Sequence, residues 1–383
     1  MLRERAERVA AIAALHADDV DANSRFPVEA MDAARHEKLL GAMVPVSLGG
    51  EGASVQDIVD ACYILGQACS SAAMIFAMHH VKAACIVRHG QASAWHREFM
   101  CRMVQQQLLL ASSTTEGQAG GDVRNSEAPV VYDGALISLE RAATVLSYGA
   151  QADAIVTTAR RAAGSLSSDQ VLVVFDKADY TLSPTFSWQT LGMRGTCSGG
   201  FHMAAKGQAV QIMPQPYAEI HTQTMTPTAH LMWGGVWAGI AATAHERARL
   251  HLRKAARGAA QPPGGLVHLA KARTGLTTLR AMLQDMLNQF ASIENNPAAL
   301  SALDFQTAIT LLKVDISEHA VASVMASLRA CGLTGYREDC EASIGRQLRD
   351  ILAAPVMINN DRIATNLGNS TLLVETPHNL QNH

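Results

Sequence analysis

The residues best suited to chemistry in this sequence lie in one short stretch rich in hydroxyl groups and glycine. Residues 114–123 read TTEGQAGGDV and follow a run of β-forming residues. Threonine hydroxyls and exposed backbone N–H groups can bond the polar edge of a flat ring, and glycines let the backbone approach a ring or a thioester closely. This stretch is therefore a candidate binding loop, and the alternative is an ordinary glycine-rich hairpin loop.

Histidine and cysteine do not combine into a metal site in this sequence. The closest pair among the 15 histidines is His79-His80, and adjacent residues on a helix point about 100° apart. The seven cysteines form no CxxC pair. We therefore expect no metal, and we expect buried free thiols in a reducing cytoplasm.

Composition indicates a folded chain with no electrostatic reason to bind nucleic acid. The 383 residues are 48% apolar and 17% charged, which is enough to bury a large core. The formal charge of −3 gives no attraction to nucleic acid or to an anionic membrane surface. No uninterrupted apolar run reaches 18 residues, so we expect no membrane span.

Three regions of different sequence pattern follow one another along the chain. Residues 1–112 carry apolar residues at helical spacing, residues 113–220 carry short β-rich runs between turn signals, and residues 221–383 are helical again. We expect an α+β, mostly helical fold with an N-terminal helical domain, a middle β-barrel-like domain and a C-terminal four-helix bundle. The expected bundle helices are 231–254, 267–290, 303–328 and 343–354.

Five motifs then give the chain a family resemblance. They are Phe26-Pro27, Val44-Pro45 with the Gly-Gly-Glu-Gly of 49–52, the loop 114–123, the turn LGMRGTCS of 191–198, and Gly332-Leu333-Thr334-Gly335-Tyr336 with Arg349-Asp350. In this order and at this spacing they resemble the acyl-CoA dehydrogenase family over essentially the whole chain. The resemblance implies the acyl-CoA dehydrogenase-like fold, the cofactor FAD and a homotetramer, with a dimer as the alternative.

The resemblance also implies where the flavin ring lies, between the β domain and the bundle. Thr114 and Thr115 correspond to positions facing the ring, and Gly121 corresponds to a residue that contacts the substrate. Ser147 can supply the hydroxyl of a family threonine. Val145 stands where a tryptophan normally packs beside the ring, so that side is more open unless Trp233 or Trp237 fills it; the alternative for both tryptophans is helix-packing core.

Cationic residues of the bundle correspond to the family's phosphate contacts, which act partly on a neighbouring subunit's flavin. Arg253 and Lys254 fall near the arginine of that motif, and Arg329 stands where the family has glutamine, just before Gly332. A guanidinium or ammonium group can pair with phosphate. The alternative for Arg329 is a solvated charge at a helix end.

The glutamate that removes a proton from the substrate in this family is missing. Counting from Arg349-Asp350 places Ile358 at its position, and an aliphatic side chain cannot accept a proton. His230 and Asp361 are candidate substitutes. The alternatives are a hydrogen-bonded histidine at a helix start and an N-cap for the final helix. Asn360 could donate hydrogen bonds to flavin or substrate.

Three functions remain open on these grounds. The first is an FAD-dependent oxidoreductase that dehydrogenates an acyl-CoA or acyl-carrier-protein thioester at the α,β bond, with hydride transfer to flavin N5. The second is a flavin-dependent monooxygenase on the same fold, which uses oxygen and needs no α-proton base. The third is a thioester enzyme of altered outcome, or a non-catalytic flavoprotein. The motifs do not set the acyl chain, its carrier or the electron acceptor.

Overall fold

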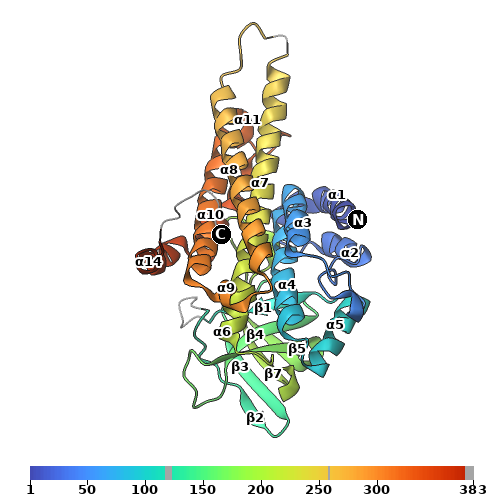
Figure 1. The fold of residues 1–383 in the computed structure, drawn as a ribbon. Helices are drawn as coiled ribbons and strands as arrows, with labels where there is room; N and C mark the ends of the chain where they lie inside the picture. The colour runs from blue at the N-terminus through green and yellow to red at the C-terminus, as the bar shows by residue number, and fades with distance from the viewer. Residues whose placement is uncertain (117–122, 258, 376–383) are drawn as a thin grey trace.

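The computed structural model describes residues 1–116, 123–257 and 259–375, which run from helices through a β region to helices again (Figure 1). The N-terminal helices come first, and one of them, α4, is buried on almost every side. It has the length and hydropathy of a membrane span, but 89% of that window is buried inside the protein, as in a core helix. The sequence analysis did not single out this helix, because His79, His80 and Lys82 interrupt its apolar run. The helices are α1 (Leu2–Ala22), α2 (Val28–His36), α3 (Val55–Ala68), α4 (Ser70–His89) and α5 (Ala94–Gln106).

The β region forms two sheets rather than one closed barrel. One sheet has the order β1-β4-β5, with β1 parallel to β4, and the other has the antiparallel order β2-β3-β7-β6. Strands β4 and β5 are buried along nearly their whole length, whereas alternate residues of β3 are buried, as expected for a strand with one face on the core. The strands are β1 (Leu110–Ser113), β2 (Val131–Asp133), β3 (Leu136–Ala143), β4 (Ala154–Arg160), β5 (Gln170–Asp176), β6 (Tyr180–Phe186) and β7 (Gly200–Gln208).

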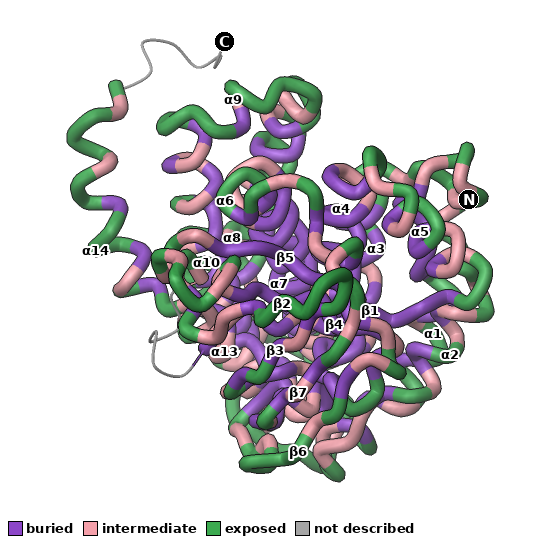
Figure 2. The backbone as a smooth tube through the Cα atoms, turned by 90° about the horizontal axis from the view of Figure 1, so that it is seen from below, coloured by how far each residue is buried: buried purple, intermediate pink, exposed green. Residues whose placement is uncertain are grey.

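Three long helices, α7, α8 and α10, make up most of the C-terminal region, and they rise from the β region in Figure 1. The expected fourth bundle helix is instead broken into the short α12 and α13, while α3 and α4 also pack along α7. Helix α14 lies beside α10 and is largely exposed (Figure 2). The elements are α6 (Tyr217–Ile220), a π-helical turn (His221–Met225), α7 (Thr226–Ala255), α8 (Leu266–Ile293), α9 (Pro297–Ser301), α10 (Leu303–Cys331), α11 (Leu333–Tyr336), α12 (Gly345–Ile351), α13 (Ala353–Val356) and α14 (Asn360–Thr371).

Helices α3 and α7 approach each other at backbone contact. A Cβ atom on Gly66 would lie 2.6 Å from the carbonyl oxygen of Val236, and one on Gly239 would lie 2.4 Å from that of Tyr63. Neither position has room for a side chain, so glycine is required at both. The N-terminal and C-terminal helices therefore share one continuous core.

Candidate functional site

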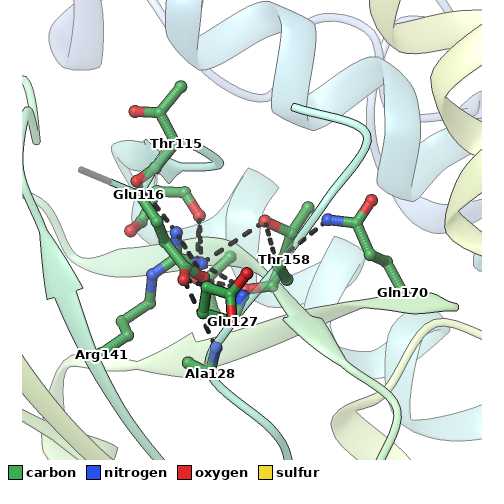
Figure 3. Close-up of polar contacts among 10 residues, drawn as sticks. Thr115, Glu116, Glu127, Ala128, Arg141, Thr158 and Gln170 are labelled. Atoms are coloured by element: carbon green, nitrogen blue, oxygen red, sulfur yellow. Dashed lines mark hydrogen bonds and ion pairs between the residues drawn. The ribbon is translucent and has the colours of Figure 1, made fainter. Parts of the chain in front are cut away.

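A buried arginine fixes the segment that leaves β1 and begins the candidate binding loop. Arg141 on β3 donates to the carbonyl oxygens of Ser113 (3.1 Å) and Thr115 (3.0 Å) and to Thr157 Oγ1 (2.8 Å). Its guanidinium also lies 3.3 Å from the carboxylate of Glu116, and both side chains are buried (Figure 3). Burial lowers the pKa of Arg141, and the Glu116 charge opposes that shift.

Glu116 connects the two described ends of the candidate binding loop. Its Oε2 accepts hydrogen bonds from the backbone N–H groups of Glu127 (2.9 Å) and Ala128 (3.3 Å). The side chains of Thr114 and Thr115 are half-buried beside it. Gly121, the predicted substrate contact, lies outside the described residues.

Hydroxyl groups line the turn that follows β3. Ser147 Oγ lies 2.8 Å from Ser198 Oγ, which in turn lies 2.8 Å from Thr196 Oγ1. Thr196 and Ser198 are buried, whereas Ser147 is half-buried and Val145 is 44% exposed. The predicted flavin residues of this turn thus present one hydroxyl and one apolar side chain toward the surface of the β region.

The motif at 191–198 is held against α12. Asp350 Oδ1 accepts from the backbone N–H of Met193 (2.7 Å), and Arg349 donates to the carbonyl oxygen of Leu191 (3.3 Å). Burial raises the pKa of Asp350, and the Met193 N–H opposes this. Two motifs about 150 residues apart therefore meet, and they join the hydroxyl turn to the C-terminal helices.

The segment at the position of the missing base contains no proton acceptor that reaches a pocket among its described residues. Ile358 has a left-handed backbone with φ of +50°, which is strained for a β-branched residue. Asp361 is exposed in the first turn of α14, so its candidacy as the base is not supported. It is not the N-cap either, because Asn359 Oδ1 accepts from the backbone N–H of Asp361 (2.8 Å) and caps the helix.

Asn360 has a structural role instead of the predicted contact with flavin. Its Oδ1 accepts from Lys313 Nζ (2.7 Å), and its Nδ2 donates to Ser317 Oγ (2.9 Å) and Glu318 Oε1 (2.8 Å). Lys313 Nζ also donates to the carbonyl oxygen of Ile358 (3.2 Å). The amide is buried and both of its N–H donors are bonded within the protein, so neither is left to donate to a ligand.

His230 is buried in the helical core, and one of its two ring nitrogens is already bonded there. Its Nδ1 lies 2.8 Å from the carbonyl oxygen of Ile309, which can only accept, so Nδ1 carries the hydrogen. Burial lowers the pKa of His230 to about 4, which outweighs the opposing hydrogen bond to Ile309. The alternative expectation, a hydrogen-bonded histidine near the helix start, describes it better.

The two tryptophans of α7 lie in the helical core. Trp237 is fully buried with Lys313 Nζ 5.9 Å from its ring centre, and Trp233 packs against His230. Their indole nitrogens have no hydrogen-bond partner among the described residues. Helix-packing core is therefore the interpretation that the structure supports for Trp237, and the space beside Val145 is not filled by it.

The predicted phosphate contacts lie at the far end of the bundle. Arg253 and Lys254 are exposed at the end of α7, and Arg329 is exposed near Gly332, which ends α10 with φ of +58°. Arg253 lies about 24 Å further along α7 than Trp237, at 1.5 Å per residue. In Figure 1 this end points away from the β region. These cations could reach a flavin beside Ser147 only if that flavin belonged to another subunit.

A groove between α8 and α10 lies at the same end. It measures about 450 Å³, and its lining includes Arg329, Lys271, His268 and His319. Arg329 and Lys271 give it a cationic rim.

Sequence reasoning overlooked two buried cations and the Ser198 hydroxyl. Arg141 shares the inward parity of Ile137 and Leu139 on β3, which could have marked it as buried. Lys313 falls at helical spacing with the buried Ile309 and Ile316, a similar signal. No local pattern would have paired Ser198 with Ser147, which lies 51 residues earlier.

Comparison with known proteins relates this geometry to flavoproteins. Residues 1–105 match the family model described as acyl-CoA dehydrogenase, N-terminal domain. A probable FMNH2-dependent monooxygenase, SfnC of Pseudomonas putida, is 22% identical over 311 residues, covering 77% of this chain and 76% of that protein.

Solved structures match the whole fold at low identity. KijD3 in complex with dTDP has a TM-score of 0.85 at 20% identity, covering 97% of this chain and 96% of that one. FMN-bound TdsC from Paenibacillus sp. A11-2 has a TM-score of 0.85 at 17% identity, covering 98% of both chains. The prolyl acyl carrier protein oxidase AnaB has a TM-score of 0.81 at 18% identity, covering 97% of this chain and 99% of that one.

Proposed function

Since this chain has the acyl-CoA dehydrogenase-like fold and carries that family's N-terminal domain, we propose that it is an atypical member that works as a monooxygenase with reduced FMN. The observation that carries the proposal is the segment before α14. Ile358 there replaces the expected carboxylate, whereas Asp361, in the first turn of α14, is exposed, and His230 is buried in the helical core with Nδ1 bonded to Ile309. Dehydrogenation of a thioester needs a base at the α-carbon, whereas oxygenation by reduced flavin does not.

The hydroxyl turn and the loop after β1 fit a flavin ring. Ser147 and the half-buried Thr114 and Thr115 offer hydroxyl groups to its polar edge. Ser113 Oγ is buried with no partner among the described residues, and a polar ring nearby would supply one. Bound reduced flavin would supply the two electrons needed to activate oxygen.

The protein's own groups would bind and orient this ring. The Arg141–Glu116 pair holds Thr115 in place, and the apolar Val145 would cover part of the ring without offering it a proton. Ile358 keeps the base position aliphatic, so the substrate meets no carboxylate from that residue. The bundle-end cations lie at the end of α7 that points away from the β region (Figure 1), which favours FMN, because FMN lacks the adenine half of FAD. In a homotetramer, Arg253 of one subunit would reach the flavin phosphate of another.

The solved carrier-protein oxidase AnaB favours a second function, oxidation of an acyl thioester on coenzyme A or a carrier protein. It would require a base that the described residues do not offer at Ile358, Asp361 or His230. FAD or FMN could serve that reaction.

One anaerobic experiment separates the two functions. The protein is loaded with oxidised FMN or FAD and mixed with short, medium and long acyl-CoA thioesters and an acyl-carrier-protein thioester, and flavin absorbance is followed. We expect no bleaching with any thioester. In a second arm, FMN is reduced with dithionite, bound to the protein and mixed with oxygen, and we expect slower release of hydrogen peroxide than from free reduced FMN. Bleaching at an enzymatic rate in the first arm would replace the proposal with thioester oxidation.

A further inference from the structure

The three hydroxyls beside the proposed flavin site form a chain whose hydrogen atoms can be ordered in only one direction. Thr196 Oγ1 lies 2.8 Å from the carbonyl oxygen of Met193, which also accepts from Trp188 Nε1 (3.0 Å). A carbonyl oxygen only accepts, and two oxygens at this distance with no hydrogen between them repel each other. Thr196 must therefore donate its single hydroxyl hydrogen to Met193.

The donor–acceptor order of the other two hydroxyls then follows from that of Thr196. Because the Thr196 hydrogen is used, the 2.8 Å contact between Thr196 and Ser198 needs the hydrogen of Ser198. Because that hydrogen is used as well, the 2.8 Å contact between Ser198 and Ser147 needs the hydrogen of Ser147. Ser147 is thus left with free lone pairs and no free hydrogen.

Burial keeps this order from being lost to solvent. Thr196 and Ser198 are each 3% exposed, so water does not compete for their hydrogens, while Ser147 at the open end is half-buried. The closed end is fixed in turn, since the Met193 backbone N–H is bonded to Asp350 Oδ1 at 2.7 Å. The chain therefore runs from a fixed carbonyl in the interior to an acceptor at the ligand side.

We propose that Thr196 and Ser198 are positioning residues that make Ser147 an obligate hydrogen-bond acceptor, and that this acceptor selects reduced over oxidised flavin. The inference rests on the proposed function, with a flavin ring beside Ser147. On reduction, N5 of the ring changes from an acceptor to an N–H donor, whereas the two carbonyl oxygens remain acceptors and N3–H remains a donor. The proposal places Ser147 opposite N5, where an acceptor bonds the N–H of the reduced ring and opposes the lone pair of the oxidised ring.

The test compares the affinities of oxidised and reduced FMN without any turnover. The dissociation constant of oxidised FMN is measured by fluorescence quenching, that of reduced FMN anaerobically, and the midpoint potential of bound FMN by dye-coupled reduction. The variants are Ser147→Ala, Ser198→Ala, Thr196→Val and, as the conservative control, Thr196→Ser, which retains the hydroxyl. Thermal melting checks that each is folded.

We expect wild type and Thr196→Ser to prefer reduced FMN. The loss of one well-placed hydrogen bond should lower that preference about tenfold in Ser147→Ala, Ser198→Ala and Thr196→Val. For a two-electron couple, that corresponds to a midpoint potential more negative by about 30 mV. The near-isosteric Thr196→Val keeps the comparison available if Ser198→Ala melts early.

The other outcomes each overturn a different statement. If FMN binds but Ser198→Ala and Thr196→Val keep the wild-type ratio of affinities, the ordering of the chain is wrong and the proposed function stands. If only Ser147→Ala changes the ratio, Ser147 touches the ring but is not controlled by its neighbours, and the inference again fails. If wild type binds neither form of FMN, the proposed function and the inference fall together.

Discussion

Two segments of this protein are each held by a buried cation, but the two cations have different partners. Arg141, beside the loop after β1, faces the Glu116 carboxylate and bonds backbone carbonyls, so its charge is balanced. Lys313, beside the segment before α14, bonds only the neutral oxygens of Ile358 and Asn360 and lies near the Trp237 ring. Burial lowers the pKa of Lys313 to about 8, against the opposing charge of Glu318.

The two segments differ in whether a buried carboxylate directly contacts the cation. The loop on the proposed flavin side keeps a carboxylate, although it serves as a clamp. The segment at the position of the missing base holds a cation that no carboxylate touches directly among the described residues; Glu318 acts on it through space, and Asn360 bonds both groups. A buried charge without an ionic partner costs stability that a paired one recovers in part.

Removing Arg141, the cation paired with Glu116, should have the largest effect on the free energy of unfolding. We expect Arg141→Met to lower the free energy of unfolding by about 3–5 kcal/mol, because Glu116 is left buried and unpaired. Urea denaturation measures this, and flavin titration should show weaker binding because Thr115 loses its anchor. The matched control is Arg161→Met, whose pair with Asp169 is about half exposed and should be worth less than about 1 kcal/mol. If both variants lost the same free energy of unfolding, the buried Arg141–Glu116 pair would be worth no more than an exposed pair.

Removing the unbalanced cation should cost less at neutral pH. Lys313→Met loses two hydrogen bonds but no longer buries a charge, so we expect a loss of about 1–2 kcal/mol at pH 7.

The pH dependence of the same variant provides a sharper test. Since the folded pKa of Lys313 is lowered from its ordinary 10.5 to about 8, the unfolded chain binds more protons between these values. Wild type should therefore gain stability relative to Lys313→Met as pH rises from 8 toward 10.5, by about 1–2 kcal/mol. Urea denaturation of both proteins at pH 7 and pH 10 measures it. A constant difference would mean that Lys313 titrates normally.

A glutamate at position 358 would give the segment before α14 a carboxylate, as the loop after β1 already has in Glu116. We expect Ile358→Glu to produce slow anaerobic bleaching of the bound flavin by an acyl thioester, at least about tenfold faster than Ile358→Gln, because a positioned base contributes strongly to proton removal. Glutamine is the matched control, since it has the same shape and no proton acceptor of comparable strength. Equal rates in the two variants would mean that position 358 does not face the substrate.

The smallest effect is expected at Asp361. Asp361→Asn should change turnover less than about twofold. It should lower the free energy of unfolding by about 0.3–0.5 kcal/mol, because a negative charge is lost at the start of α14. Steady-state kinetics and urea denaturation check both values. A hundredfold loss of turnover would restore Asp361 as the base.

Local sequence patterns predicted the long helices well, whereas the C-terminal segment at 343–354 also depends on contacts with distant residues. The expected helices at 303–328 and 231–254 lie within α10 and α7. The expected helix 343–354 is divided between α12 and α13, and Arg349 and Asp350 of α12 are held by the distant loop at 191–198.

At the site, the motifs located Ser147 and Thr115 but not what controls them. Arg141 could have been found from its parity on β3. The bond between Lys313 and Asn360 spans 47 residues, and no single-sequence pattern connects them. For the same reason the sequence analysis offered Asn360 as a donor to flavin or substrate, although both of its N–H donors are bonded to Ser317 and Glu318.

The backbone contact between α3 and α7 limits how this protein can be recombined. A chimera that takes its first hundred residues from one relative and its last helices from another would bring together two helix surfaces shaped in different backgrounds. Unless both parents carry glycine at the positions of Gly66 and Gly239, a side chain would meet a carbonyl group at less than 3 Å. Successful exchanges should therefore take α3 and α7 from the same parent, which a single crossover in the β region between them cannot do.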